Sequence, residues 1–270
     1  MSKIVLITGA SSGIGKETAK LLVQNGYKVY AAARRIEKMS ELETVGVHLI
    51  NMDVANEQSI VNGIEQITKA EGRVDILINN AGFGQYGAIE DVALAEARYQ
   101  LEVNLFGLAR LVQLVLPGMR EQRFGKIVNI SSIGGKVAAP LGGWYHASKF
   151  ALEGLSDSLR MEVKPFGIDV IVIEPGGVKT EWGAIALGNA SKTAERSAYK
   201  KLIDGAQNIG EKTAEKNMEP IEIAILIKQS IEASKPKIRY VKGYLARPIL
   251  FMKRWLSDRI LDKVIMSQLK

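Results

Sequence analysis

Tyr145 and Lys149 are the two residues of this sequence whose types and spacing most clearly predict chemistry. They stand four positions apart in Trp-Tyr-His-Ala-Ser-Lys, and this spacing places both side chains on one face of a helix. A free tyrosine, with a pKa near ~10, is a poor base at neutral pH. A neighbouring ammonium favours the phenolate and lowers that pKa. The pair therefore predicts a general acid/base, although a Tyr-x-x-x-Lys pair taken alone usually indicates a solvated helix face.

Two serines, Ser131 and Ser132, end an apolar segment that precedes the Tyr145 helix. We expect the segment to be a strand that ends at the same sheet edge as the start of that helix. A hydroxyl at this edge could hold a substrate oxygen beside the phenol. The residues alone do not choose between the two serines.

A glycine-rich loop follows the first apolar segment and precedes a helix. Its sequence is Thr8-Gly9-Ala10-Ser11-Ser12-Gly13-Ile14-Gly15. Glycines let the backbone turn sharply and let a pyrophosphate approach it closely, and the helix N-terminus adds free N–H groups and the positive end of the helix dipole. The loop predicts dinucleotide binding; the alternative is an ordinary tight turn between strand and helix.

Polar residues follow two further apolar segments. Asp53 could accept a hydrogen bond from an adenine amino group, or it could be a helix N-cap, a position that Asp also favours. Asn79-Asn80-Ala81-Gly82 suits a backbone packed against a ligand at the edge of a sheet, and an Asn/Gly turn is the alternative.

The elements that must position these residues are short apolar strands alternating with helices. Segments rich in Val and Ile do not alternate cleanly between apolar and polar, as expected for strands covered on both faces. Strand–helix–strand repetition predicts a parallel sheet with right-handed crossovers. We expect strands within 3–9, 27–34, 47–54, 74–82, 125–132, 168–176 and 237–243, and helices over 14–25, 57–71, 95–120 and 145–165.

The predicted fold is therefore α/β, a doubly wound Rossmann-type parallel sheet of seven strands with helices on both faces. We expect one dinucleotide-binding domain over residues 1–270. Within it, 181–236 is predicted to cover the substrate as loops and helices, and 248–270 to form a basic amphipathic C-terminal helix.

Composition and charge exclude several classes of function. The chain has no cysteine, which excludes disulfides, thiol nucleophiles and cysteine zinc sites, and its two histidines are too isolated to predict a metal site. The formal charge is +7, and residues 235–270 hold ten Lys and Arg against two acids, so no chain-wide nucleic-acid surface is expected. We expect no signal peptide, no apolar run near the ~18 residues of a membrane span, and a cytoplasmic location.

Taken together and in order, these motifs resemble the short-chain dehydrogenase/reductase family over about the first 180 residues. The resemblance implies that Tyr145 is the general acid/base, and that Lys149 lowers its pKa and binds the nicotinamide ribose. It selects Ser132, thirteen residues before the tyrosine, to orient the substrate oxygen. It also implies that Asn104 holds a water of a proton relay. The remaining implied cofactor contacts are Gly9, Ser11, Ser12, Gly13, Ile14, Gly15, Asp53, Val54, Asn80, Ala81, Gly82, Pro175, Gly176, Val178 and Thr180.

The end of the second predicted strand bears on the choice of cofactor. An acid there binds the ribose 2′-OH of NAD, whereas an arginine accommodates the 2′-phosphate of NADP. This sequence has Ala33 followed by Arg34 and Arg35, and a guanidinium binds phosphate through a fork of donors. We therefore expect NADP(H) to be preferred over NAD, unless both arginines are merely solvated.

The substrate and the assembly are predicted only as classes. The Pro-Gly-Gly-Val-Lys-Thr-Glu-Trp-Gly stretch and the long C-terminal end resemble the hydroxysteroid- and retinol-dehydrogenase-like branch, which implies an apolar alcohol or carbonyl substrate. Family analogy implies a homodimer or homotetramer.

The rival hypotheses are a catalytically silent NADP-binding sensor or scaffold and a non-redox enzyme on the same fold. The basic C-terminus predicts either contact with an anionic membrane surface or packing on the pocket or on another subunit.

Overall fold

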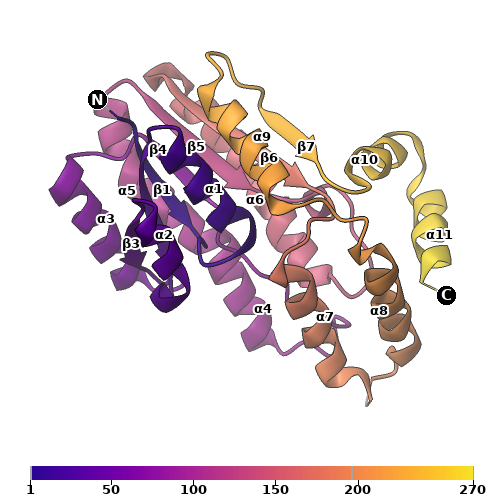
Figure 1. The fold of residues 1–270 in the computed structure, drawn as a ribbon. Helices are drawn as coiled ribbons and strands as arrows, with labels where there is room; N and C mark the ends of the chain where they lie inside the picture. The colour runs from indigo at the N-terminus through magenta and orange to yellow at the C-terminus, as the bar shows by residue number, and fades with distance from the viewer. Residues whose placement is uncertain (1, 196, 270) are drawn as a thin grey trace.

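A single parallel sheet organises the computed structural model, which describes residues 2–195 and 197–269. Its seven strands lie in the order β3-β2-β1-β4-β5-β6-β7, and every neighbouring pair is parallel (Figure 1). The predicted fold class is therefore confirmed. The strands are β1 Ile4–Thr8, β2 Lys28–Ala33, β3 His48–Asn51, β4 Ile76–Asn79, β5 Gly125–Ile130, β6 Ile168–Pro175 and β7 Arg239–Lys242.

The strand order reverses at β1, which has β2 on one side and β4 on the other. Connections leave the two neighbouring strands toward opposite faces at such a point, which opens a crevice outside their carboxyl ends. The glycine loop follows β1 and the Asn79–Gly82 segment begins at the end of β4. Both are thus brought to the crevice from distant parts of the chain.

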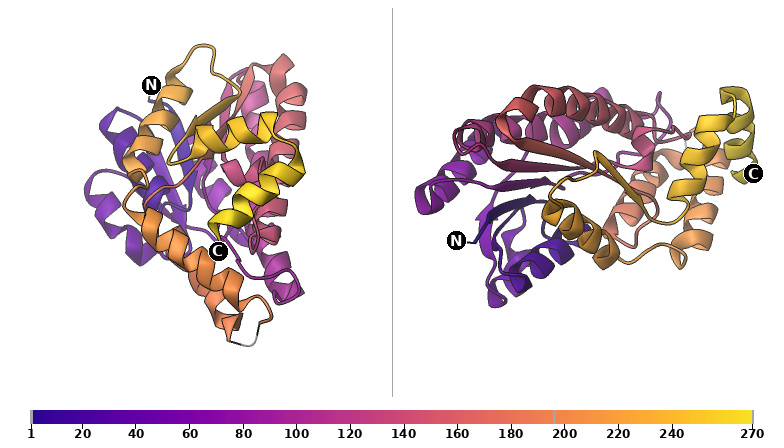
Figure 2. Two further views of the ribbon diagram at one scale, coloured as in Figure 1. Left: turned by 90° about the vertical axis from the view of Figure 1, so that its right-hand side faces the viewer. Right: turned by 90° about the horizontal axis from the view of Figure 1, so that it is seen from above.

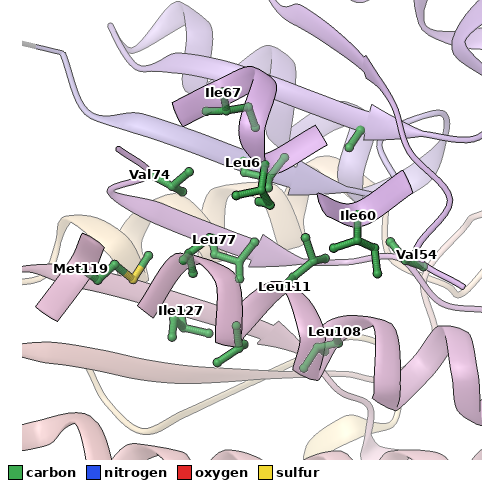
Figure 3. Close-up of a cluster of buried hydrophobic side chains, with 14 of the residues drawn as sticks. Leu6, Val54, Ile60, Ile67, Val74, Leu77, Leu108, Leu111, Met119 and Ile127 are labelled. Carbon is green, nitrogen blue, oxygen red and sulfur yellow. The ribbon is translucent and has the colours of Figure 1, made fainter. Parts of the chain in front are cut away.

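One face of the sheet is covered by α3 (Glu57–Glu71), α5 (Gly107–Glu121) and α6 (Gly143–Val163). Side chains from these helices interdigitate with alternate residues of the strands, as Leu6, Leu77 and Ile127 show (Figure 3). Because alternate strand residues point to opposite faces, Val5, Ile7 and Ile76 belong to a second core on the other face.

That second core is closed by α1 (Gly13–Gln24), α2 (Ser40–Thr44) and α9 (Pro220–Glu232). Figure 2 shows the two helical layers on either side of the sheet in its right-hand view. Ile223, Ile227 and Ile231 of α9 are buried against the sheet. The predicted covering segment 181–236 is therefore too long, because its last helix belongs to the core.

A continuous helical segment of 28 residues runs through Leu94–Glu121. It comprises α4 (Leu94–Leu101), a π-helical turn η2 (Glu102–Phe106) and α5. Its most apolar 18-residue window has a mean hydropathy of 1.3. By length and composition alone the segment could cross a membrane, so the expectation that no apolar run comes near the length of a membrane span is wrong. Its buried side chains, including Leu111 and Val115, pack against the sheet core, which is the setting of a core helix.

The C-terminal part beyond β6 adds helices at one end of the molecule. Here α7 (Glu181–Ala194) and α8 (Lys200–Ala214) precede α9, and α10 (Ala246–Trp255) and α11 (Asp258–Gln268) follow β7. The single helix predicted over 248–270 is two helices. Leu256 is extended, and Ser257, a residue type that favours the start of a helix, is the N-cap of α11. Short 3₁₀ turns complete the fold: η1 Ile36–Met39, η3 Ile133–Gly135 and η4 Lys164–Phe166.

Candidate active site

Tyr145 and Ser132 meet at the carboxyl end of β5. Ser132 begins the short η3 turn, where its hydroxyl accepts a hydrogen bond from Gly134 N at 2.9 Å. Tyr145 lies in the first turn of α6, is buried, and hydrogen-bonds Ser132. A substrate oxygen placed between the two hydroxyls would contact both.

The neighbouring serine lies in a different setting. Ser131 is 4% exposed, and its hydroxyl has no hydrogen-bond partner within the described part of the chain. It lies on the side of Gly135, where an added Cβ would come within 2.9 Å of the Ser131 Oγ. The structure thus brings Ser132, and not Ser131, to the tyrosine hydroxyl.

Lys149 lies one turn after Tyr145 on α6 and is also buried. Its ammonium donates to the carbonyl oxygen of Ile130 at 2.8 Å and lies 6.0 Å from the centre of the Tyr145 ring. Burial lowers the pKa of Lys149 to about 8, while Glu153 on the next turn acts in the opposite direction.

The pKa of Tyr145 differs from the sequence-based expectation. Burial raises it to about 12, and the Ser132 hydrogen bond opposes the rise. The lowering expected from Lys149 is not seen, because the ammonium is held by Ile130 O instead of by the phenol oxygen. A raised tyrosine pKa keeps the phenol protonated at neutral pH, so the phenol has a proton that it could donate.

Asn104 is positioned by the π-helical turn η2 and is 1% exposed. Its amide nitrogen donates to Phe83 O at 3.0 Å and to Ser148 Oγ at 3.1 Å, and its oxygen accepts from Phe83 N at 3.0 Å. The side chain therefore ties the segment after β4 to α6. An added Cβ at Gly82 would meet both Asn104 Oδ1 at 3.2 Å and Lys149 Nζ at 3.7 Å, so Gly82 lies between Asn104 and Lys149.

The glycine loop has the geometry that a pyrophosphate requires. Gly9 and Gly13 have φ angles of +67° and +55°, which side chains rarely tolerate. A Cβ at Gly9 would come within 2.7 Å of Ala81 Cα, and one at Gly15 within 2.5 Å of Gly9 O. The Ser12 side chain makes no capping hydrogen bond at the start of α1, so the first N–H groups of this helix remain available for an anion.

Asn80 braces this loop from the neighbouring strand. Its amide nitrogen donates to the carbonyl oxygens of Thr8 and Gly9, both at 3.0 Å, and its backbone N–H donates to Thr8 Oγ1 at 3.1 Å. The Asn79–Gly82 segment is therefore more than an ordinary turn, because it fixes the position of the glycine loop.

Asp53 lies on the wall of the crevice, as its possible role toward adenine requires. Its carboxylate accepts from Ala55 N at 2.9 Å, whereas the N-cap of α3 is Asn56, whose side chain accepts from Ser59 N. The N-cap interpretation of Asp53 is therefore wrong.

A cavity of about 760 Å³ connects the glycine loop with the tyrosine. Every residue that the sequence predicted for the site lines it, except Gly15 and Asn104. Gly15 lies beneath the loop, against Gly9 and Asn80. Two halves of the cavity differ in chemistry: one is glycine-rich and holds Arg34, Arg35 and Asp53, and the other is apolar and aromatic beyond Tyr145.

A model of the short chain dehydrogenase family matches residues 3–186. The chain belongs to the short-chain dehydrogenase family. It is therefore an oxidoreductase with a nicotinamide dinucleotide site, and the family predicted from the sequence is confirmed.

Relatives match this short-chain dehydrogenase over nearly its whole length. It is 39% identical over 264 residues to 3-ketodihydrosphingosine reductase of Bacteroides thetaiotaomicron, covering 96% of this chain and 95% of the relative. It is 33% identical over 283 residues to NADPH-dependent 3-dehydrocapnine reductase of Ornithobacterium rhinotracheale, covering 99% and 98%. The crystal structure of a short-chain dehydrogenase from Streptomyces avermitilis superimposes with a TM-score of 0.79 at 31% identity, covering 98% and 94%.

The two arginines at the cofactor half of this dehydrogenase's cavity have different partners. Arg34 directly follows β2, is exposed, and donates to the hydroxyl of Tyr99 on α4. Arg35 lies 3.9 Å from a carboxylate oxygen of Glu181 at the start of α7. Ala33, at the end of β2, provides no acid.

The apolar half of the cavity includes residues that the sequence analysis did not identify. Tyr86 and Trp182 pack around the Tyr145 ring, with ring centres at 5.8 Å and 4.9 Å from it. Trp182 lies within the Pro175–Gly183 stretch that the sequence analysis compared with a family branch, but its place beside the Tyr145 ring was not predicted. The apolar periodicity of the C-terminal residues predicted a helix there, but not its place at the cavity. The inner side chains of α10 and α11 that line the cavity are Ile249, Met252, Leu261, Ile265 and Leu269.

Proposed function

We propose that this short-chain dehydrogenase reduces the carbonyl group of an apolar substrate with NADPH, Tyr145 acting as the proton donor. The observation that carries the proposal is the shared cavity, in which the Ser132–Tyr145 pair lies between a glycine-rich half and an apolar half. This arrangement gives a dinucleotide and an apolar compound one common meeting point, at a buried proton donor.

The residues of the glycine-rich half fit a dinucleotide. The close approach at Gly9 and the free N–H groups at the start of α1 would receive the pyrophosphate. Lys149, whose ammonium lies under the end of β5, would reach the nicotinamide ribose. The bound cofactor supplies or accepts the hydride, and the protein positions it and moves the proton.

The proton step follows from the positions of Ser132 and Tyr145. The Ser132 hydroxyl would donate to the carbonyl oxygen and hold it beside the phenol. Tyr145 would then give its proton to that oxygen as the alcohol forms. Burial keeps the phenol protonated at neutral pH, which is the form that can donate a proton to the carbonyl oxygen.

Arg34 is the residue that we propose to select NADPH. It directly follows Ala33, which ends β2 at the position where an acid would bind the 2′-OH of NAD. Its guanidinium has other donors besides the one that Tyr99 accepts from, so it can bind a 2′-phosphate. The name of the 3-dehydrocapnine reductase, which is NADPH-dependent, supports the same choice.

The apolar half of the cavity supports an apolar body for the substrate. Its walls are aliphatic side chains of α10 and α11, with the rings of Tyr86 and Trp182 nearest the phenol. The name of the 3-ketodihydrosphingosine reductase describes reduction of a keto compound, which supports a ketone as the reacting group.

The test is cofactor oxidation with a series of unbranched ketones of increasing chain length. We expect NADPH oxidation to yield the alcohol in equal amount, with kcat/KM rising with chain length. NADPH binding without turnover of any ketone or aldehyde would favour a silent sensor. Product formation without net cofactor oxidation would favour a non-redox enzyme, and either result would overturn the proposal.

A further inference from the structure

We propose that the outer faces of α10 and α11 form a docking surface for an anionic lipid bilayer. The two helices lie side by side on one face of the molecule, as the left view of Figure 2 shows. The proposal goes beyond the catalysed reaction, since docking does not depend on which carbonyl compound is reduced.

The outer face of α10 combines large apolar and cationic side chains. Phe251 and Trp255 are 66% and 67% exposed, and their ring centres lie 6.3 Å apart. Arg247 and Arg254 are exposed too. They lie four and three positions from Phe251, which places them on the same face of the helix. Exposing such large apolar rings to water is unfavourable in free energy.

The outer face of α11 repeats the pattern. Ile260 and Met266 are 50% and 42% exposed. Arg259, next to Ile260, and Lys263, between the two apolar residues, are exposed as well. An outer face with basic residues around Trp, Phe and Ile side chains is typical of helices that lie in a membrane interface.

Most of the unpaired positive charge of residues 235–269 lies on these outer faces, and Lys235 and Lys237 before β7 carry the rest. Arg239 binds Glu153 and Asp157, and Lys242 binds Glu222, so these cations near the sheet are neutralised. By contrast, none of four cations on the outer faces has a carboxylate partner within the described part of the chain: Arg247, Arg254, Arg259 and Lys263.

The two acids of this region do not cancel that charge. Asp258 is held by Lys253 at 2.7 Å, which lies at the side of α10. Asp262 is exposed at the edge of the outer face of α11. A net positive surface with projecting apolar groups complements anionic headgroups above an apolar interior, and each cation near such a surface contributes about 1 kcal/mol.

The inner faces of the same helices explain what docking would accomplish. Ile249 and Met252 of α10 and Leu261 and Ile265 of α11 line the apolar half of the cavity. In the docked protein, α10 and α11 would thus lie between the bilayer and the active site, with their outer faces toward the bilayer and their inner faces toward the cavity. An apolar substrate dissolved in the bilayer would reach the cavity between them with little exposure to water.

The experiment is co-sedimentation of the full-length protein with vesicles at low salt. One set contains phosphatidylcholine alone and the other phosphatidylcholine with phosphatidylserine. We expect binding to the second set, weakened by added salt because exposed charges are screened. Failure to bind anionic vesicles at low salt would overturn the proposal, whatever the protein does with ketones.

Matched charge reversals locate the surface. Arg254→Glu combined with Lys263→Glu should reduce the partition coefficient by about tenfold or more. Lys69→Glu combined with Lys235→Glu makes the same change of charge at exposed residues on α3 and before β7 and should leave binding within about twofold. Equal losses for both pairs would mean that general charge, and not this surface, causes binding.

A separate measurement tests the contribution of the apolar side chains to vesicle binding. Tryptophan emission should shift to shorter wavelength when anionic vesicles are added, and Trp255→Phe should abolish most of the shift while retaining binding. Phe251→Ser combined with Trp255→Ser should weaken binding with unchanged thermal stability. The alternative is that the wild-type protein does not bind vesicles and is a dimer that this variant dissociates. In that case the face is a contact between two copies, and the membrane proposal is wrong.

Discussion

The hydroxyl of Ser132 hydrogen-bonds the phenol of Tyr145, although the two residues belong to different elements. Ser132 begins the turn after β5, and Tyr145 lies in the first turn of α6. The Ser132 oxygen is fixed in turn by Gly134 N. Backbone geometry therefore holds the proposed proton donor beside the hydroxyl that we propose to orient the carbonyl oxygen.

Tyr145→Phe should remove the proton donor and leave the fold intact, because only a hydroxyl is lost. We expect kcat to fall by ~10²–10⁴, the usual contribution of a general acid, with NADPH affinity unchanged. Steady-state kinetics and a fluorescence titration of NADPH measure the two effects. Near-normal turnover by a correctly folded variant would exclude Tyr145 as the proton donor.

Arg34→Ala should weaken NADPH binding much more than NADH binding. A lost hydrogen bond to a charged group costs ~1.5–3 kcal/mol, which corresponds to roughly tenfold or more in Kd. Arg35→Ala is the matched control; we expect a smaller loss, because Arg35 faces Glu181. Equal losses for the two cofactors in the Arg34 variant would show that Arg34 does not bind the 2′-phosphate.

The sheet could be predicted from the sequence because buried parallel strands read as short apolar segments between helices. The glycine loop and the Tyr145–Lys149 pair were identifiable because their backbone and spacing requirements are local, whereas Ser132 was selected over Ser131 only by the family resemblance. The raised pKa of Tyr145 was not predictable, since it depends on burial beneath Tyr86 and Trp182. The proposed oligomer and the cytoplasmic location remain predictions.

The C-terminal helices illustrate a second limit of the sequence. Their amphipathic pattern predicted a helix with two unlike faces, but not what each face contacts. Placement of Ile265 in the cavity and of Ile260 on the outside depends on how α10 and α11 fold back over residues far away in the chain. α9 was misplaced for the same reason, because its contact with α1 is tertiary.

His146 should make the stability of the protein depend on pH. Its ring is buried, with Nδ1 2.9 Å from Gly134 O and Nε2 accepting from Ala139 N at 3.0 Å. This pattern requires a neutral ring that carries its proton on Nδ1. Burial lowers its pKa below the ordinary 6.5, against the effect of the two backbone hydrogen bonds.

The sign follows from proton uptake. Because the folded-state pKa is lowered, the unfolded chain binds more protons below pH 6.5, and the stabilisation present above that value is lost as the pH falls. His146→Gln should be less stable than the wild type at pH 7.5, and the difference should shrink toward pH 5.5. Urea midpoints at both pH values measure it; a constant difference would mean that His146 does not titrate in this range.

Filling the apolar half of the cavity should shorten the substrates that the enzyme accepts. Ile265 on α11 lines the cavity, whereas Ile260 on the same helix is 50% exposed. Ile265→Trp places an indole where the end of a long chain would lie, and Ile260→Trp makes the same substitution outside. Each methylene excluded from an apolar site costs about 0.8 kcal/mol, so losing two of them lowers kcat/KM roughly tenfold. We expect this loss for long-chain ketones only and only in the Ile265 variant. An equal loss for short-chain ketones would indicate a distorted active site, and unchanged kinetics with long chains would place the apolar body of the substrate elsewhere.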